Sequence, residues 1–370
     1  MSSMSRPTIF LLLLASAALA AQQSASQPTT AATGPNPDTS YIDAQGTVHV
    51  TRVVPVPKTI SAEAQRVLAH PVLILPGIPD IPDQGSPAPM SLDQSRGIVD
   101  AYAARAAEAW RKICAVDIVE DRIAGVPVRI VRPKGLTEAN RDKVLLNLHG
   151  GGFEFEGGSL AESIPIASYA KIKVVTVLYR LAPEYPFPAA VDDAISVYKE
   201  LLKTYRPEHI AIYGTSAGAT LTAEVAAKLK QLGLPLPGAL GIFSGSGDFA
   251  RTGDSEALFG LRGLSGHLDP PESSPDDSDY TARTDLKDPV LSPVYSDLRG
   301  IPPTLFVTSE RDMLLSGTVN LHRAYLSAGV DARLVVFDAL THGFWYDAQL
   351  PEAREASHIM ADFFVKQLGK

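Results

Sequence analysis

Ser216 is the residue in this sequence that is best placed to act as a nucleophile. It lies in Gly214-Thr215-Ser216-Ala217-Gly218, directly after the apolar run Ile210–Tyr213 and directly before an Ala-rich helical pattern. A tight turn between a strand and a helix exposes the serine hydroxyl, and glycines two positions away leave room for the strained backbone. The same pentapeptide also occurs in loops that only cap a helix, so the strand-and-helix context carries this prediction.

A serine hydroxyl becomes a strong nucleophile only when a base takes its proton and a carboxylate orients that base. The histidines that follow Ser216 are His267, His322, His342 and His358. His342 comes just after the last strand-like run, where a loop should begin. The other three fall within helical patterns or an irregular segment. We therefore predict that His342 is the base.

The carboxylate partner is expected in the loop after the preceding strand-like run, Thr304–Val307. Asp312 and Glu310 both lie there. Asp338 is a third choice, but it comes very close to His342 in the next loop. The order Ser, then acid, then His is the order in which one hydrolase fold delivers these groups. We predict Asp312 as the orienting acid and keep Glu310 as the alternative.

Acyl transfer also needs hydrogen-bond donors aimed at the developing oxyanion. His149-Gly150-Gly151-Gly152 follows the buried-strand pattern Val144–Leu148. Glycines let the backbone turn its amides into a cavity without an obstructing Cβ. We predict that the N–H groups of Gly151, Gly152 and Ala217 form the oxyanion hole. A phosphate-binding loop is the weaker interpretation, because G-x-x-x-x-G-K-[ST] is absent from the sequence.

The elements that must position these residues alternate between buried strands and amphipathic helices. The expected strands are Ala115–Arg122, Val126–Arg132, Val144–Leu148, Val174–Leu178, Ile210–Tyr213, Ala239–Phe243, Thr304–Val307 and Arg333–Phe337. The expected helices are Leu92–Cys114, Ala189–Thr204, Ala217–Leu232, Val319–Ala328 and Glu352–Leu368, with a short helical patch near Glu256–Leu264. This alternation predicts an α/β fold, with a mostly parallel sheet covered by helices on both faces. The first two strands predict an antiparallel hairpin at one edge, and residues 40–95 are expected to be irregular.

The N-terminus has the pattern of a targeting segment rather than of a folded one. Arg6 precedes an apolar run at 9–15, and Ala18-Leu19-Ala20 provides a small-residue cleavage site. Residues 1–20 therefore predict a cleaved signal peptide and a secreted or periplasmic protein. An uncleaved anchor is the alternative, because the positive region has one arginine. Residues 21–40 predict a flexible linker, and no stable membrane insertion is expected of the mature chain.

Composition excludes several classes of function. The net charge is −8 and no Lys/Arg-rich run is present, so nucleic-acid binding is not expected. Cys114 is the single cysteine, so no intrachain disulfide can form; we expect a buried thiol there rather than a catalytic one. No histidine pair, cysteine cluster or EF-hand pattern is present, so a metal cofactor is not expected.

Taken together, these residues resemble the hormone-sensitive-lipase-like family of α/β-hydrolases, in particular its microbial carboxylesterases with a Gly-Thr-Ser-Ala-Gly pentapeptide. The match spans roughly residues 115–365. It rests on His149–Gly152, Tyr179-Arg180-Leu181-Ala182-Pro183-Glu184, the Ser216 turn, Ser292-Pro293, Ile301-Pro302-Pro303-Thr304, and the Asp312 and His342 loops. The sequence departs from the family pattern at Leu178, Thr215 and Ala219, and Leu178 puts the hydrogen bonding of its loop in question.

The resemblance implies an α/β-hydrolase domain with a helical cap. We assign residues 41–114 to an N-terminal cap segment and 115–370 to the catalytic domain, with 244–292 as a second cap insertion. The resemblance also implies that no cofactor is needed and that His149 shapes the oxyanion loop instead of acting as the base.

The expected activity is that of a serine carboxylesterase acting on short- to medium-chain esters through an acyl-enzyme. Phe153, Phe155, Phe344 and Trp345 are candidates for the substrate pocket, with core packing as the alternative. A small-molecule ester is the expected partner, and a homodimer stays open. Lactone hydrolysis, polysaccharide deacetylation and amide hydrolysis are the rival reactions. A non-catalytic binding protein of this fold is less favoured, because receptors of the family lack the histidine that His342 supplies here.

Overall fold

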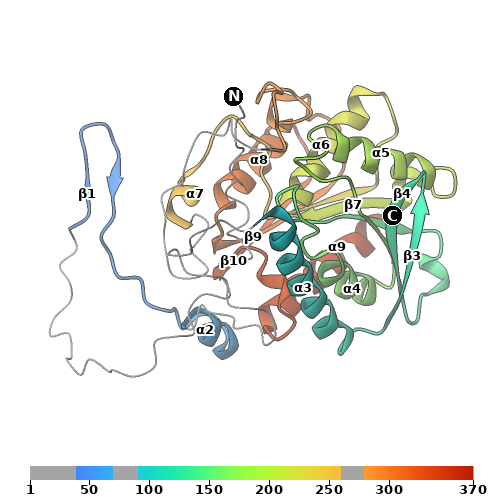
Figure 1. The fold of residues 1–370 in the computed structure, drawn as a ribbon, viewed down its shortest axis with the longest axis horizontal. Helices are drawn as coiled ribbons and strands as arrows, with labels where there is room; N and C mark the ends of the chain where they lie inside the picture. The colour runs from blue at the N-terminus through green and yellow to red at the C-terminus, as the bar shows by residue number, and fades with distance from the viewer. Residues whose placement is uncertain (1–38, 70–90, 260–278, 370) are drawn as a thin grey trace.

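An eight-stranded sheet forms the centre of the molecule. The computed structural model describes residues 39–69, 91–259 and 279–369 (Figure 1). The strands run in the order β10-β9-β8-β7-β5-β6-β4-β3. They are β3 (Val116–Ile123), β4 (Val126–Pro133), β5 (Val144–Leu148), β6 (Lys173–Val177), β7 (Ile210–Thr215), β8 (Ala239–Phe243), β9 (Thr304–Arg311) and β10 (Ala332–Thr341). Strands β3 and β4 pair as an antiparallel hairpin at one edge, β4 is antiparallel to β6, and the other pairs are parallel. The predicted α/β fold class and the edge hairpin are confirmed.

Helices cover both faces of the sheet, so its central strands are buried on two sides. On one face lie α3 (Leu92–Arg111), α4 (Ser159–Ala170) and α9 (Pro351–Leu368), and α4 packs against both of the others (Figure 1). On the other face lie α5 (Ala189–Leu201), α6 (Ala217–Gln231) and α8 (Leu315–Ser327). Side chains along β5 alternate between the two layers: Leu146 and Leu148 join the core with α5 and α6, and Leu145 joins the core with α4 and α9.

The remaining elements in the described ranges are short. They are the two-residue strands β1 (Tyr41–Ile42) and β2 (Val48–His49), the helices α2 (Ala62–Ala69) and α7 (Asp254–Phe259), and the single 3-10 turns η3 (Glu138–Asn140), η4 (Pro207–His209), η6 (Pro293–Tyr295) and η7 (Phe344–Tyr346). The hairpin of β1 and β2 extends away from the main sheet (Figure 1).

Two helices differ from the sequence expectation. Helix α4 was not predicted, because it is buried almost all round and so lacks an amphipathic period, and Pro165 lies inside it. Helix α2 lies within the stretch 40–95 that was expected to be irregular. Its one fully buried residue is Ala64, so the apolar stripe that identifies a helix is narrow.

Several predictions fall on residues outside the described ranges. These are the signal peptide at 1–20, nearly all of the linker at 21–40, His267, and most of the second cap insertion beyond α7. Of the described helices, none is long and apolar enough to cross a bilayer. Cys114 is buried, and burial raises the pKa of its thiol, as expected for a structural rather than a reactive cysteine.

Arg96 fastens α3 to the loops at the carboxyl edge of the sheet. Its Nε donates to the Glu154 carbonyl at 2.9 Å and its Nη2 to the Ala182 carbonyl at 2.9 Å. The guanidinium also forms a two-point pair with the Glu184 carboxylate, with both N–O distances 2.7 Å. A planar guanidinium suits such a convergent arrangement because its donors are fixed in one plane.

Replacing Arg96 should therefore destabilise the protein more than replacing a surface arginine. Arg96→Ala leaves two partly buried carbonyls without this donor, and a buried group without a partner costs about 1–3 kcal/mol. Each kcal/mol lowers Tm by about 2–4 °C in a domain of this size. The control is Arg66→Ala, which removes a pair with Glu63 in which the arginine side chain is 65% exposed, and it should barely shift Tm. Equal Tm values for the two variants in a thermal scan would contradict this account.

Candidate active site

The turn between β7 and α6 holds Ser216 in a strained conformation. Its backbone has φ 60° and ψ −124°, a combination that residues other than glycine rarely adopt. Ser216 N–H donates to the Phe243 carbonyl of the neighbouring strand at 2.9 Å, which fixes the turn against β8. The strain is thus held by the surrounding sheet, as the sequence context predicted for a nucleophile turn.

The two flanking glycines are required by the packing of this turn on β5. A Cβ added at Gly214 would lie 2.2 Å from the Leu148 carbonyl oxygen, and one at Gly218 would lie 1.9 Å from the same atom. Neither distance is compatible with a side chain, because the obstructing atom belongs to the backbone. The spacing of the pentapeptide therefore reflects a close approach of three backbone segments.

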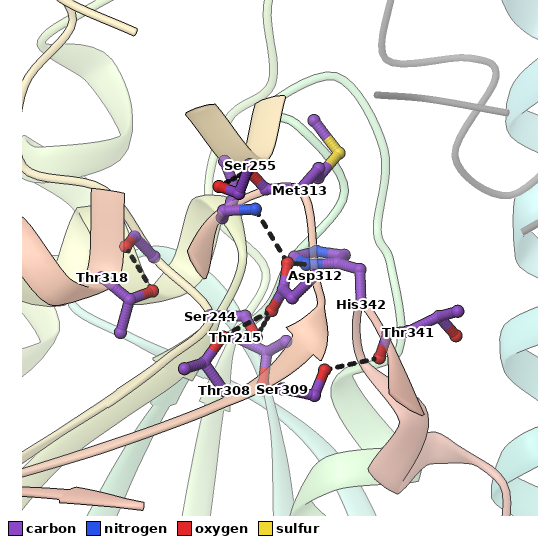
Figure 2. A network of polar contacts seen from close by, with 12 residues as sticks. Thr215, Ser244, Ser255, Thr308, Ser309, Asp312, Met313, Thr318, Thr341 and His342 are labelled. Atoms are coloured by element: carbon purple, nitrogen blue, oxygen red, sulfur yellow. Dashed lines mark hydrogen bonds and ion pairs between the residues drawn. The ribbon is translucent and has the colours of Figure 1, made fainter. Parts of the chain in front are cut away.

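Asp312 and His342 are joined by a hydrogen bond. His342 Nδ1 lies 2.8 Å from Asp312 Oδ1 (Figure 2), so the tautomer with its proton on Nδ1 donates to this carboxylate. His342 Nε2 is buried and has no hydrogen-bond partner among the described residues. This is the arrangement that a general base requires: one nitrogen oriented by a carboxylate and the other free to accept a proton.

The Asp312 carboxylate is completely enclosed and receives several donors. Leu314 N–H donates to Oδ1 at 2.8 Å, Thr308 Oγ1 donates to Oδ2 at 2.9 Å, and the Ser244 hydroxyl also donates to Oδ2 (Figure 2). Burial raises the pKa of Asp312, but the neighbouring His342 and these hydrogen bonds outweigh burial, so the pKa is lowered from its usual value. The carboxylate therefore stays charged beside the imidazole.

The other candidate acids and bases lie elsewhere. Glu310 and Asp338 interact with each other, and Asp338 accepts a hydrogen bond from Thr59. Among the histidines, His322 packs edge-on against Phe306, and His358 stacks on Tyr169. Of the three acids considered, Asp312 is the one bonded to His342.

The loop Gly150–Gly152 follows β5 and faces the nucleophile turn. Gly151 and Gly152 have φ of 108° and 62°, and a Cβ on Gly151 would lie 2.2 Å from the Phe155 carbonyl oxygen. The Gly151 carbonyl accepts from Phe155 N–H at 2.9 Å, which closes the loop. Within the described ranges, the N–H groups of Gly151, Gly152 and Ala217 donate to no other group, so they are available to a ligand.

His149 supports this loop through contacts of its ring and of its carbonyl group. Its Nδ1 lies 2.8 Å from the Gly150 carbonyl, and its ring stacks on Tyr179 with centroids 4.1 Å apart. The Tyr179 hydroxyl donates to the His149 carbonyl at 2.6 Å. Burial lowers the pKa of His149, so the imidazole is held neutral. These contacts agree with a shaping role for His149.

The four aromatic residues proposed for the substrate pocket are all buried. Phe153 stacks on Tyr280 with ring centroids 3.5 Å apart, and Trp345 Nε1 donates to Thr215 Oγ1 at 3.0 Å. Phe155 and Trp345 are each 1% exposed, and Phe344 is 6% exposed. Trp345 and Phe344 pack with each other in the core layer next to α9. A pocket role for these side chains stays a prediction.

The sequence reasoning missed the residues that support the acid and the loops. Ser244, the partner of Asp312, directly follows β8, and a polar residue at the carboxyl end of a buried strand is the signal that could have found it. Arg96 carried no comparable signal, because its partners are two backbone carbonyls and the Glu184 carboxylate, all distant from it in the sequence. In the residues that the structure covers, no group of three or more His, Cys, Asp or Glu side chains could hold a metal ion.

Comparison with known proteins adds to this geometry. A family model described as alpha/beta hydrolase fold matches residues 145–346, more than half of the chain. An acetyl-hydrolase of Streptomyces hygroscopicus is 32% identical over 232 residues, which cover 62% of this chain and 77% of that protein. An esterase of Acinetobacter venetianus is 29% identical over 255 residues, covering 64% and 80%.

Solved structures agree with this match. The crystal structure of an esterase named E25 has a TM-score of 0.71 at 30% identity and covers 86% of this chain and 97% of that one. An esterase from the bacterial hormone-sensitive lipase family has a TM-score of 0.67 at 28% identity, covering 83% and 99%. The chain belongs to the hormone-sensitive-lipase-like family of α/β-hydrolases. The predicted family is therefore confirmed.

The departures of this hydrolase from its family pattern leave the loops intact. Leu178 N–H donates to the Pro127 carbonyl at 3.0 Å. The adjacent Arg180 binds the Asp193 carboxylate through its Nε and Nη2. The loop is therefore held by Asp193 and by β4, without an acid at position 178.

Proposed function

We propose that this hydrolase is a serine carboxylesterase that cleaves short- to medium-chain esters through an acyl-enzyme on Ser216. The chain is a carboxylic ester hydrolase, as its relatives show, among them an acetyl-hydrolase and an esterase. The observation that carries the residue assignment is the hydrogen bond from His342 to the buried Asp312, with His342 Nε2 left unpartnered.

The proposed reaction has two halves. Ser216 Oγ attacks the ester carbonyl carbon while His342 Nε2 takes the hydroxyl proton, and the oxyanion is bound by the N–H groups of Gly151, Gly152 and Ala217. The C–O bond to the alcohol then breaks, and His342 returns the proton to the leaving alkoxide. Water attacks the acyl-enzyme with His342 again as base, and the carboxylic acid leaves with Ser216 restored.

Asp312 stabilises the imidazolium that forms in each half of the reaction. Because its pKa is lowered, it remains an anion beside His342. It also fixes the tautomer, since the proton on Nδ1 points to Oδ1 and Nε2 is thereby the acceptor.

We also propose that residues 41–114 and 244–292 form a cap over this site. Arg96 of α3 supports the proposal because it binds the carbonyl of Glu154 in the oxyanion loop. Ser255 of α7 supports it as well: its hydroxyl donates to the Met313 carbonyl at 2.7 Å, one residue beyond Asp312.

Lactone, amide and acetylated-polysaccharide hydrolysis stay as alternatives, because they use the same three groups. The name of the acetyl-hydrolase relative favours small acyl groups. A non-catalytic binding protein would not require the hydrogen bond between His342 and Asp312, so this pair favours an enzyme.

Ser216→Ala should abolish turnover. With p-nitrophenyl acetate, butyrate and octanoate as substrates, kcat should fall by several orders of magnitude, because removing one member of the triad removes most of its effect. The parent enzyme should prefer acetate or butyrate to octanoate and should be labelled by a fluorophosphonate at Ser216. Turnover that survives in Ser216→Ala, or a parent enzyme that is not labelled, would contradict the assignment of Ser216 as the nucleophile.

Asp312→Asn should lower kcat by roughly 10³–10⁴-fold, because the amide no longer stabilises the imidazolium and favours the wrong tautomer. Glu310→Gln is the matched control, since Glu310 lies on the same strand end but interacts with Asp338. It should change kcat little. A severe loss in Glu310→Gln with a mild one in Asp312→Asn would mean that the acid is wrongly assigned.

We further propose that residues 1–20 direct export and are then removed. Support comes from Arg6, the apolar run at 9–15 and the small-residue site Ala18-Leu19-Ala20. The exported protein should begin at Ala21, which N-terminal sequencing would read. An exported chain that still carries residue 1 would point to an anchor instead.

A further inference from the structure

A carboxyl group that the proposed mechanism does not use lies directly behind the nucleophile turn. Glu162 on α4 is 1% exposed. Its Oε1 accepts the hydroxyl proton of Thr215, the residue before Ser216, and its Oε2 accepts from Asn147 Nδ2 at 2.9 Å. Thr215 is in turn the acceptor for Trp345 Nε1.

These contacts link three of the four segments of the site through the side chains of Glu162 and Thr215. Asn147 lies two residues before His149, where the oxyanion loop begins. Thr215 precedes the nucleophile. Trp345 lies in η7, three residues after His342. Glu162 itself comes from a helix that supplies none of the proposed catalytic groups.

The indole of Trp345 fixes the direction of one of these hydrogen bonds. The indole of Trp345 can only donate, so Thr215 Oγ1 accepts there and its single proton must go elsewhere. That proton goes to Glu162, the acceptor at the end of the chain of donors. Without an acceptor at position 162, the buried Thr215 hydroxyl would have to turn away from one of its partners.

Burying this network is expected to cost free energy of folding, not to stabilise the fold. Asn147 occupies a strand position whose alternation places it in the apolar layer with Leu145, next to α4. Burial raises the pKa of Glu162 to about 7, and the hydrogen bonds from Thr215 and Asn147 only partly oppose this. Two neutral donors do not replace the lost hydration of a buried carboxylate, and apolar replacements of buried charges are often neutral for stability. We therefore expect the network to serve the positioning of the site rather than the stability of the fold.

We propose that Glu162 is a positioning residue for ester hydrolysis: through Thr215 it fixes the Ser216 turn relative to the His342 loop. This inference rests on Ser216 and His342 having their proposed roles. A displacement of about 1 Å at a reacting group can cost about 10²-fold in rate. Glu162 touches neither substrate nor the reacting atoms, so its effect should fall on kcat and leave KM nearly unchanged.

The test compares two replacements at this position. Glu162→Leu is close in size but cannot accept the Thr215 proton. Glu162→Gln keeps an acceptor oxygen, and its amide can donate to Asn147 Oδ1, which has no partner in the described structure, after a half-turn of the Asn147 amide. The matched control is Ser163→Ala, which breaks a buried hydrogen bond of 2.7 Å to Thr176 from the next residue of the same helix.

Each enzyme is titrated with a fluorophosphonate so that kcat refers to reactive sites, and p-nitrophenyl acetate is the substrate. Glu162→Leu should lose about 30- to 100-fold in kcat, with KM changed by less than about three-fold. Glu162→Gln should recover most of that loss, and Ser163→Ala should keep the parent kcat. If Glu162→Leu does not fold, Thr215→Val breaks the same contact from the other side and should show the same loss in kcat.

The proposal would be overturned if Glu162→Leu kept the parent kcat. It would also be overturned if Glu162→Gln lost as much kcat as Glu162→Leu. Ser216→Ala, run beside them, separates this failure from that of the proposed function. Activity surviving in Ser216→Ala contradicts the esterase mechanism itself. An inactive Ser216→Ala together with an unaffected Glu162→Leu contradicts only the positioning role.

Discussion

The site depends on one close backbone approach, the packing of the β7–α6 turn against the end of β5. Gly214 and Gly218 lie so near the Leu148 carbonyl that neither can carry a side chain. Leu148 is also the last residue of the strand that leads into the oxyanion loop. A single contact between neighbouring parallel strands therefore sets the distance between the nucleophile and the amides that would receive the oxyanion. The strain at Ser216 is the consequence of holding this contact.

The second half of the site follows from the order of the strands. Strands β8, β9 and β10 continue the parallel sheet beyond β7, so Ser244, Asp312 and His342 leave it at the same edge. Parallel strands place their carboxyl ends together, and sites in open α/β sheets form there. Burial raises the pKa of Asp312, but His342 and the hydrogen bonds from Ser244 and Leu314 outweigh burial and lower it from its usual value. The imidazole is thereby oriented before any substrate arrives.

The groups proposed to act on the substrate could be chosen from the sequence more readily than those that support them. Ser216, Asp312 and His342 could be chosen because each follows a strand-like run of the sequence, in the chain order Ser, acid, His. Glu162 could not, because α4 is buried almost all round and shows no helical period, so neither the helix nor its single inward carboxyl stood out. Arg96 and Ser244 were missed for a different reason. Their partners are distant in sequence, and only the folded chain brings them together.

In the proposed reaction, the acyl group of the ester is carried by Ser216. Rapid quenching of the enzyme during turnover of a p-nitrophenyl ester, followed by peptide mass spectrometry, tests it most directly. The account predicts that the peptide carrying Ser216 gains the acyl group of the ester used, and that this adduct decays as the carboxylic acid is released. Steady turnover with no adduct on that peptide, or with the acyl group on another residue, would contradict it.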